Sequence, residues 1–159
     1  MSRAIKYRVW WKGVTYQYAD GRPDQVYPAR WMTGNDCIVK PDGTLAQEDY
    51  ELCTISNPED YVVEQFTGLL DRDGKEIYEG DIVKASLAEE GGDVTDERTK
   101  QVGRICYRSD TAGYSLCHTL HDSPYRVDIS VLFLRGAVSQ RLEIIGNIHE
   151  NRELIPKTT

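Results

Sequence analysis

The sequence has no long apolar segment. None of its 159 residues belongs to a run that approaches the roughly 18 consecutive apolar residues of a membrane helix, so we expect no membrane association. The first residues, Met1–Trp11, also lack the apolar region of a signal peptide. We therefore expect a cytoplasmic protein, whose cysteines are reduced thiols. These cysteines are Cys37, Cys53, Cys106 and Cys117.

A sustained 3.6-residue apolar period is also missing, which predicts little helix. Residues from Ile5 to Trp11 instead alternate between apolar and mainly basic side chains, as in a strand with two different faces. Gly13 follows, and Val14–Tyr18 is predicted to return as the hairpin partner of this first strand. Ser56–Glu59 is compatible with the start of a short helix that has Pro58 in its first turn. The short run Cys37–Val39 lies between two turn signals and belongs either to another hairpin or to a loop-rich excursion. Further strands are predicted at Tyr61–Thr67, Ile82–Leu87, Val102–Tyr107, Tyr114–Cys117, Tyr125–Leu134 and Leu142–Ile148.

The most informative segment is Gln65–Lys84, which contains two tight turns. Asp71–Gly74 forms the first turn, and Gly80–Asp81 precedes the β-prone pair Ile82–Val83, as is common in SH3-like barrels. We therefore predict a mainly β fold, with a small SH3-like barrel-type unit, additional β-hairpins and little helix. The chain is expected to form a single unit or two β lobes, at about residues 1–60 and 61–154. The acidic segment 88–100 is predicted to be an exposed, mobile loop.

Motifs of nucleotide-dependent enzymes and of serine or cysteine hydrolases are absent, so we predict that the protein is not an enzyme. Cys117, His118 and His121 resemble part of a zinc site, but no second pair of ligands accompanies them at the usual spacing. A group of carboxylates could bind Ca²⁺ or Mg²⁺, although ordinary turn chemistry explains it better. We therefore predict no metal and no cofactor, and retain a metal-dependent enzyme as the last alternative. The carboxylates are Asp71, Asp73, Glu76, Glu79 and Asp81.

The net charge of −7 is unevenly distributed. Residues 1–31 carry six basic and two acidic groups, residues 32–97 carry four and eighteen, and residues 98–159 carry nine and six. The three segments therefore have net charges of +4, −14 and +3. The acidic middle would repel a phosphate backbone, which argues against non-specific DNA binding. The basic ends are free to form a local patch or to pair with the acidic middle of a neighbouring subunit.

Aromatic and basic side chains alternate near the N-terminus. Such side chains stack on the bases of single-stranded nucleic acid, or fill protein interfaces, in which Tyr, Trp and Arg are enriched. Because the chain is acidic, we favour protein contact and keep a nucleic-acid-binding SH3- or OB-like module as the alternative. The candidate interface residues are Arg8, Trp10, Trp11, Tyr16 and Trp31.

Three segments together resemble a known family. Gln65–Val83 closely resembles the signature of the YopX-like phage and prophage proteins. Glu143–Asn151 is similar to the closing motif of that family, and Ile5–Trp10 to its first strand. The chain departs from the family pattern at Arg152, where proline is usual, and residues 102–141 match no family segment.

The resemblance implies a mainly β protein with a barrel-like part that self-associates and is encoded by temperate phages or prophages. It implies no established activity and no catalytic or binding residue. We therefore predict a homo-oligomeric accessory protein that acts by binding a host or phage protein in the cytoplasm of a bacterial host.

Overall fold

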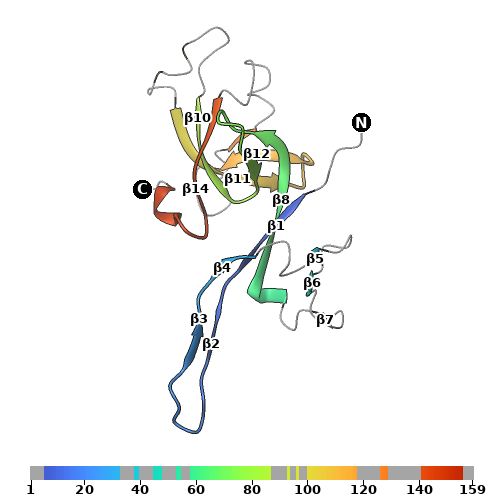
Figure 1. The fold of residues 1–159 in the computed structure, drawn as a ribbon. Helices are drawn as coiled ribbons and strands as arrows, with labels where there is room; N and C mark the ends of the chain where they lie inside the picture. The colour runs from blue at the N-terminus through green and yellow to red at the C-terminus, as the bar shows by residue number, and fades with distance from the viewer. Residues whose placement is uncertain are drawn as a thin grey trace. The chain divides into compact units, whose positions relative to one another are not determined.

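The computed structural model describes residues 6–32, 38–39, 45–47, 53–54, 58–86, 93, 96, 100–117, 126–128 and 141–155. These residues form short strands and two 3₁₀ turns, with no helix of seven or more residues among them (Figure 1). The prediction of a mainly β fold with little helix is therefore confirmed. Within these residues, no helix has the length and apolarity needed to cross a bilayer.

The described chain divides into two compact units. The N-terminal unit covers Lys6–Gln65, and the described part of the C-terminal unit begins at Phe66. The strands of the N-terminal unit are β1 (Tyr7–Trp11), β2 (Val14–Tyr16), β3 (Gln25–Tyr27), β4 (Arg30–Trp31), β5 (Ile38–Val39), β6 (Leu45–Gln47), β7 (Cys53–Thr54) and the first half of β8 (Tyr61–Leu70).

Strand β1 lies between β4 and β8 and is antiparallel to both. The prediction that Val14–Tyr18 pairs with the first strand is therefore wrong, because both edges of β1 are occupied. Instead, β2 pairs with β3 to form a two-stranded ribbon. Gly13, with a φ of 75°, makes the junction. A Cβ atom on Gly13 would lie 2.6 Å from the Ala29 nitrogen and 2.8 Å from the Pro28 carbonyl carbon, so this close approach requires glycine.

The other predicted elements of this unit are present. Ile38–Val39 pairs with β6, so the run Cys37–Val39 belongs to a hairpin. Pro58–Asp60 forms a 3₁₀ turn with Pro58 at its first position, and β8 starts directly after it. The predicted strand Tyr61–Thr67 extends to Leu70.

The C-terminal unit is built around a five-stranded antiparallel sheet with the order β13-β12-β11-β10-β14, which curls into a half-barrel. Its barrel-like character agrees with the predicted fold class. Its elements are the end of β8, β9 (Glu76–Tyr78), β10 (Asp81–Ser86), β11 (Lys100–Arg108), β12 (Gly113–Cys117), β13 (Arg126–Asp128), β14 (Leu142–Asn147) and the 3₁₀ turn η4 (Arg152–Leu154).

The predicted strands of this unit differ from the observed ones mainly at their ends. Of the predicted strand Tyr125–Leu134, the structure describes Arg126–Asp128 as β13, and the remainder lies outside the described residues. Most of the predicted loop 88–100 also lies outside them, and Lys100 already belongs to β11.

The apolar core of the C-terminal unit lies on one face of the curled sheet. Alternate residues of a strand point to opposite faces, so β10 contributes Val83 and Ala85 to this core. The neighbouring strands supply residues at matching register positions. The fully buried members are Ile77, Val83, Ala85, Ile105, Leu116 and Leu142.

Cys106 and Cys117 form a disulfide between β11 and β12, so the prediction that all four cysteines are reduced is wrong for this pair. The strand register pairs Cys106 with Ser115 and Arg104 with Cys117. The two cysteines are therefore diagonal neighbours on one face, with Cα atoms 6.5 Å apart, within the range of a disulfide. The sequence alone did not reveal this register.

Candidate interaction surface

The acidic cluster of the Gln65–Lys84 segment performs turn chemistry in the structure. Asp71 is 2% exposed, and its Oδ1 accepts hydrogen bonds from the backbone amides of Asp73 at 2.9 Å and Lys75 at 2.8 Å. Its other oxygen, Oδ2, accepts a bond from the Ile144 amide at 3.3 Å. Asp71 therefore closes its own turn and attaches that turn to β14.

Two other acidic residues of this cluster also bond locally. Oδ2 of Asp81 accepts a hydrogen bond from the Tyr78 amide at 2.8 Å, and Oε2 of Glu76 accepts one from the Tyr78 hydroxyl at 2.8 Å. Within the described part of the chain, no three His, Cys, Asp or Glu side chains are grouped to hold a metal. Cys117 of the considered zinc cluster is in the disulfide, and His118 and His121 lie outside the described residues.

Three of the five predicted interface residues pack against one another in the N-terminal unit. The Arg8 guanidinium bonds to the carboxylate of Glu64, with Nε at 2.8 Å and Nη2 at 2.7 Å from Oε2. The same guanidinium lies 4.4 Å from the centre of the Trp31 ring. Trp31 in turn meets Trp10 edge-on, at 5.0 Å between ring centres. Trp10 is 8% exposed and Glu64 is 2% exposed, whereas Arg8 and Trp31 are half-buried, so this cluster is partly covered by the unit.

Trp11, by contrast, lies on the opposite face of β1 and is half-buried. Its ring centre is 6.4 Å from that of Tyr27, and the Arg30 guanidinium is 6.0 Å from it. Tyr16 pairs with Gln25 through the backbone of the ribbon, and its side chain is not among those described. The structure thus places Trp11 at the base of the β2–β3 ribbon, away from the Arg8 cluster.

The β2–β3 ribbon contains the candidate interface residue Tyr16, but the sequence did not predict the ribbon as a whole. Every residue from 19 to 30 is exposed, including Val26 at 65% and Tyr27 at 39%. Local polar contacts shape its turn. The Arg22 guanidinium lies 4.2 Å from the Tyr18 ring centre, and its Nε lies 2.8 Å from Oδ2 of Asp20. This hydrogen-bonded ion pair lowers the pKa of Asp20 below its ordinary value.

The sequence profile of the YopX protein family matches residues 6–156, which include every described residue. The chain belongs to the YopX protein family. The structure of this YopX protein is similar to the crystal structure of protein EF1440 from Enterococcus faecalis, with 20% sequence identity and a TM-score of 0.42. That match covers 98% of this chain and 100% of EF1440. A comparison with curated proteins finds no match.

In this YopX protein, the Gln65–Val83 and Glu143–Asn151 motifs lie beside each other. Besides the bond from the Ile144 amide to Asp71, the Arg72 amide donates to the carbonyl of Leu142, directly before the closing motif, at 2.9 Å. The Ile148 amide donates to the Gly80 carbonyl at 3.0 Å. Hydrogen bonds therefore join the two motifs into one structure. These bonds give the motif residues a role in the fold.

Proposed function

We propose that this protein is a non-catalytic accessory protein of a phage or prophage, which acts by binding in the cytoplasm of the bacterial host, where the Cys106–Cys117 disulfide would be open to reduction. Its first partner is a second copy of the same chain, and the assembled form engages a host or phage protein. The β2–β3 ribbon is the surface that we assign to self-association. The exposure of this ribbon is the observation that carries the proposal.

The ribbon lacks the support that a stable β-structure requires. No third strand joins β2 and β3 among the residues that the structure describes. An isolated two-stranded hairpin is marginally stable in water, and three strands or a packed face are normally needed. Docking on a second copy would cover Val26 and Tyr27 and supply this missing face.

The base of the ribbon has the composition of an interface anchor. Trp11, Tyr27 and Arg30 lie together there, and these three residue types are enriched among the side chains that dominate binding energies. The partly exposed rings of Trp11 and Tyr27 offer apolar contact area, and ordering them on binding costs little side-chain entropy. Each would be further desolvated by a docked partner.

Charge complementarity favours a second copy as the occupant. The ribbon itself carries Arg22 against Asp20 and Asp24, and the cations are at its base, where Lys12 and Arg30 belong to a segment (1–31) of net charge +4, whereas segment 32–97 has −14. Opposite charges on facing surfaces steer association and fix its register. A single-stranded nucleic acid is a weaker candidate, because Trp10 and Trp31 already pack on each other and Trp10 is buried, which leaves fewer rings for base stacking.

Size-exclusion chromatography with light scattering tests the proposal. Wild-type protein should exceed the 18.1 kDa of one chain across the micromolar range. Val26→Asp places a charge on the most exposed apolar side chain of the ribbon and should shift the protein towards the monomer. Leu154→Asp is the matched control, because Leu154 is also exposed but belongs to η4.

The control should keep the wild-type mass, and circular dichroism should show that both variants are folded. A wild-type protein that stays monomeric at every concentration would exclude self-association. A Val26→Asp variant with the wild-type mass would exclude the ribbon as the surface.

A further inference from the structure

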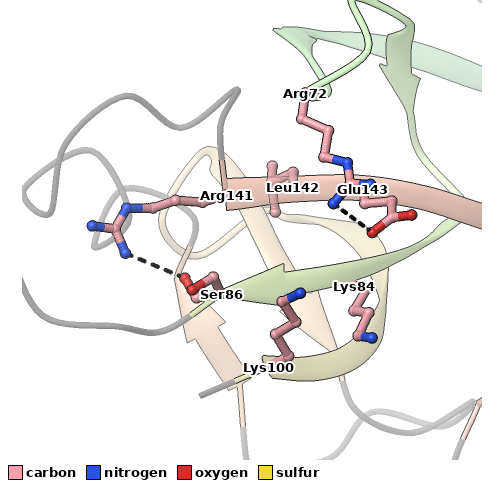
Figure 2. Close-up of a pocket in the computed structure, with 7 residues that line it drawn as sticks. All are labelled: Arg72, Lys84, Ser86, Lys100, Arg141, Leu142 and Glu143. Carbon is pink, nitrogen blue, oxygen red and sulfur yellow. Dashed lines mark hydrogen bonds and ion pairs between the residues drawn. The ribbon is translucent and has the colours of Figure 1, made fainter. Parts of the chain in front are cut away.

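A shallow recess in the C-terminal unit gathers positive charge. Four of its lining side chains are cationic and one is acidic, in a chain whose net charge is −7 (Figure 2). The recess is open: its enclosed part has room for about one water molecule, and the rest of its roughly 210 Å³ is open to solvent. The lining residues are Arg72, Lys84, Ser86, Lys100, Arg141, Leu142 and Glu143.

The strand register brings these cations together. Lys84 on β10 is directly opposite Glu143 on β14, and Ser86 is directly opposite Lys100 on β11. Lys84 and Lys100 are thus diagonal neighbours on the sheet face opposite to the apolar core. A phosphate placed between these two ammonium groups would accept hydrogen bonds from both.

Arginines complete the recess from two sides. Arg141 is 6% exposed, and its Nη1 lies 3.5 Å from the carbonyl oxygen of Ser86. Arg72 approaches from the turn after β8, with its Nη1 3.1 Å from Oε2 of Glu143. Counted over its own side chains alone, four cations and one carboxylate, the lining has a formal charge of +3.

We propose that this recess binds a phosphate group of a small phosphorylated ligand, of which pyrophosphate is the simplest probe. Lysine offers a compact charge to phosphate oxygens, and the arginine fork offers paired donors. Lys84, Lys100 and Arg141 also take part in other interactions, so binding exchanges their partners. A polymer is disfavoured, because the acidic remainder of the chain repels a long phosphate backbone.

Isothermal titration with pyrophosphate at low salt tests this site. Wild-type protein should bind the probe, and the Lys84→Gln/Lys100→Gln variant should bind it roughly tenfold more weakly or worse, because two charge-assisted contacts are lost. The control variant Lys6→Gln/Lys75→Gln removes the same charge at exposed positions outside the recess and should bind as wild type does. A third variant, Lys84→Arg/Lys100→Arg, keeps the charge and should retain binding.

Thermal unfolding of each variant, with and without pyrophosphate, gives a second measurement of the same site. The probe should raise the melting temperature of the wild type and of the control, but not that of Lys84→Gln/Lys100→Gln. Absence of binding to wild type, or equal weakening in the control, would overturn the proposal. A short single-stranded oligonucleotide that binds more tightly than pyrophosphate, and is lost with the same lysines, would overturn the small-ligand assignment in favour of nucleic acid.

Discussion

Among single residues, Asp71 connects local turn chemistry with the packing of the C-terminal unit. Its carboxylate accepts hydrogen bonds from three backbone amides, two in its own turn and one in β14. Asp71→Ala would leave these amides without this acceptor in a buried place, and each unsatisfied group costs about 1–3 kcal/mol. We expect the variant to lose about 3 kcal/mol or more of unfolding free energy, measured by urea denaturation.

The neighbouring Asp73 provides the control for this measurement. Its carboxylate is 56% exposed and lies 4.0 Å from Nε of Arg72. An exposed pair of this kind contributes about 0–1 kcal/mol, so Asp73→Ala should be nearly neutral. Equal losses for the two variants would show that the role assigned to Asp71 is incorrect.

Arg8 is a second residue whose contacts within its unit can be tested. It pairs with Glu64, which is 2% exposed, and covers the Trp31 ring. Arg8→Met should destabilise the protein by about 3 kcal/mol, because breaking a buried pair leaves a carboxylate without its cation. The double variant Arg8→Met/Glu64→Gln should be less destabilised than the single variant, as measured by the same denaturation experiment.

Arg22→Met is the matched control, because the Arg22–Asp20 pair is exposed on both sides. Its loss should stay within about 1 kcal/mol. If Arg8→Met were as mild as Arg22→Met, the ion pair with Glu64 would not support the fold.

The sequence predicted the role of Asp71 and did not predict that of Arg8, and the difference lies in the distance along the chain. The Asp71 turn is encoded within four residues, where Asp and Gly have intrinsic turn preferences. Arg8 finds Glu64 56 positions away, through strand pairing. The sequence therefore suggested an interface role for Arg8 and did not reveal its ion pair with Glu64.

At the scale of elements, the positions of most strands were predictable from local sequence, whereas their pairing partners were not. Alternation and turn residues located most strands, including β10 and β14, because both signals are local. The β2–β3 ribbon was missed, because its identity depends on β4 and β8 occupying the edges of β1. Exposure of the ribbon, on which the proposed self-association rests, followed only from this topology.

The turn of the ribbon contains a titratable probe of its own structure. Arg22 holds the pKa of Asp20 below the ordinary 3.8, through hydrogen bonding of the charged form. An aspartate whose pKa is lowered by folding stabilises the folded turn above its ordinary pKa, and this contribution is lost as the pH falls through the lowered value. NMR titration of the Asp20 carboxyl should therefore give a pKa below 3.8 in the wild type.

Arg22→Gln should move the Asp20 pKa up towards 3.8, since the side-chain bond from Arg22 is the largest cause of the shift. Asp110 is the internal reference, because Arg108 lowers its pKa independently in the C-terminal unit. A shift of Asp110 in the Arg22→Gln variant, or an ordinary pKa for Asp20 in the wild type, would contradict the ribbon geometry.

For the molecule as a whole, the family match covers residues 6–156, and the three segments that resemble family motifs all fall on strands and turns of the fold. The opening, central and closing motifs provide β1, the β8–β10 turns and β14. Hydrogen bonds join the last two of these across the C-terminal unit. The segments with family resemblance therefore belong to the scaffold of the fold. The ribbon and the cationic recess became visible only in the folded chain.

The Cys106–Cys117 disulfide makes the stability of the molecule depend on its redox environment. The bond joins residues 11 positions apart, and closing a loop of that size in the unfolded chain is worth about 3 kcal/mol in the entropic account. Urea denaturation with and without dithiothreitol should show a loss of this order in the reduced wild type. The Cys106→Ser/Cys117→Ser variant should unfold at the same urea concentration in both buffers, because it cannot form this disulfide. A reductant effect of equal size in that variant would place the redox dependence elsewhere, and no effect in the wild type would show that the disulfide does not stabilise the sheet.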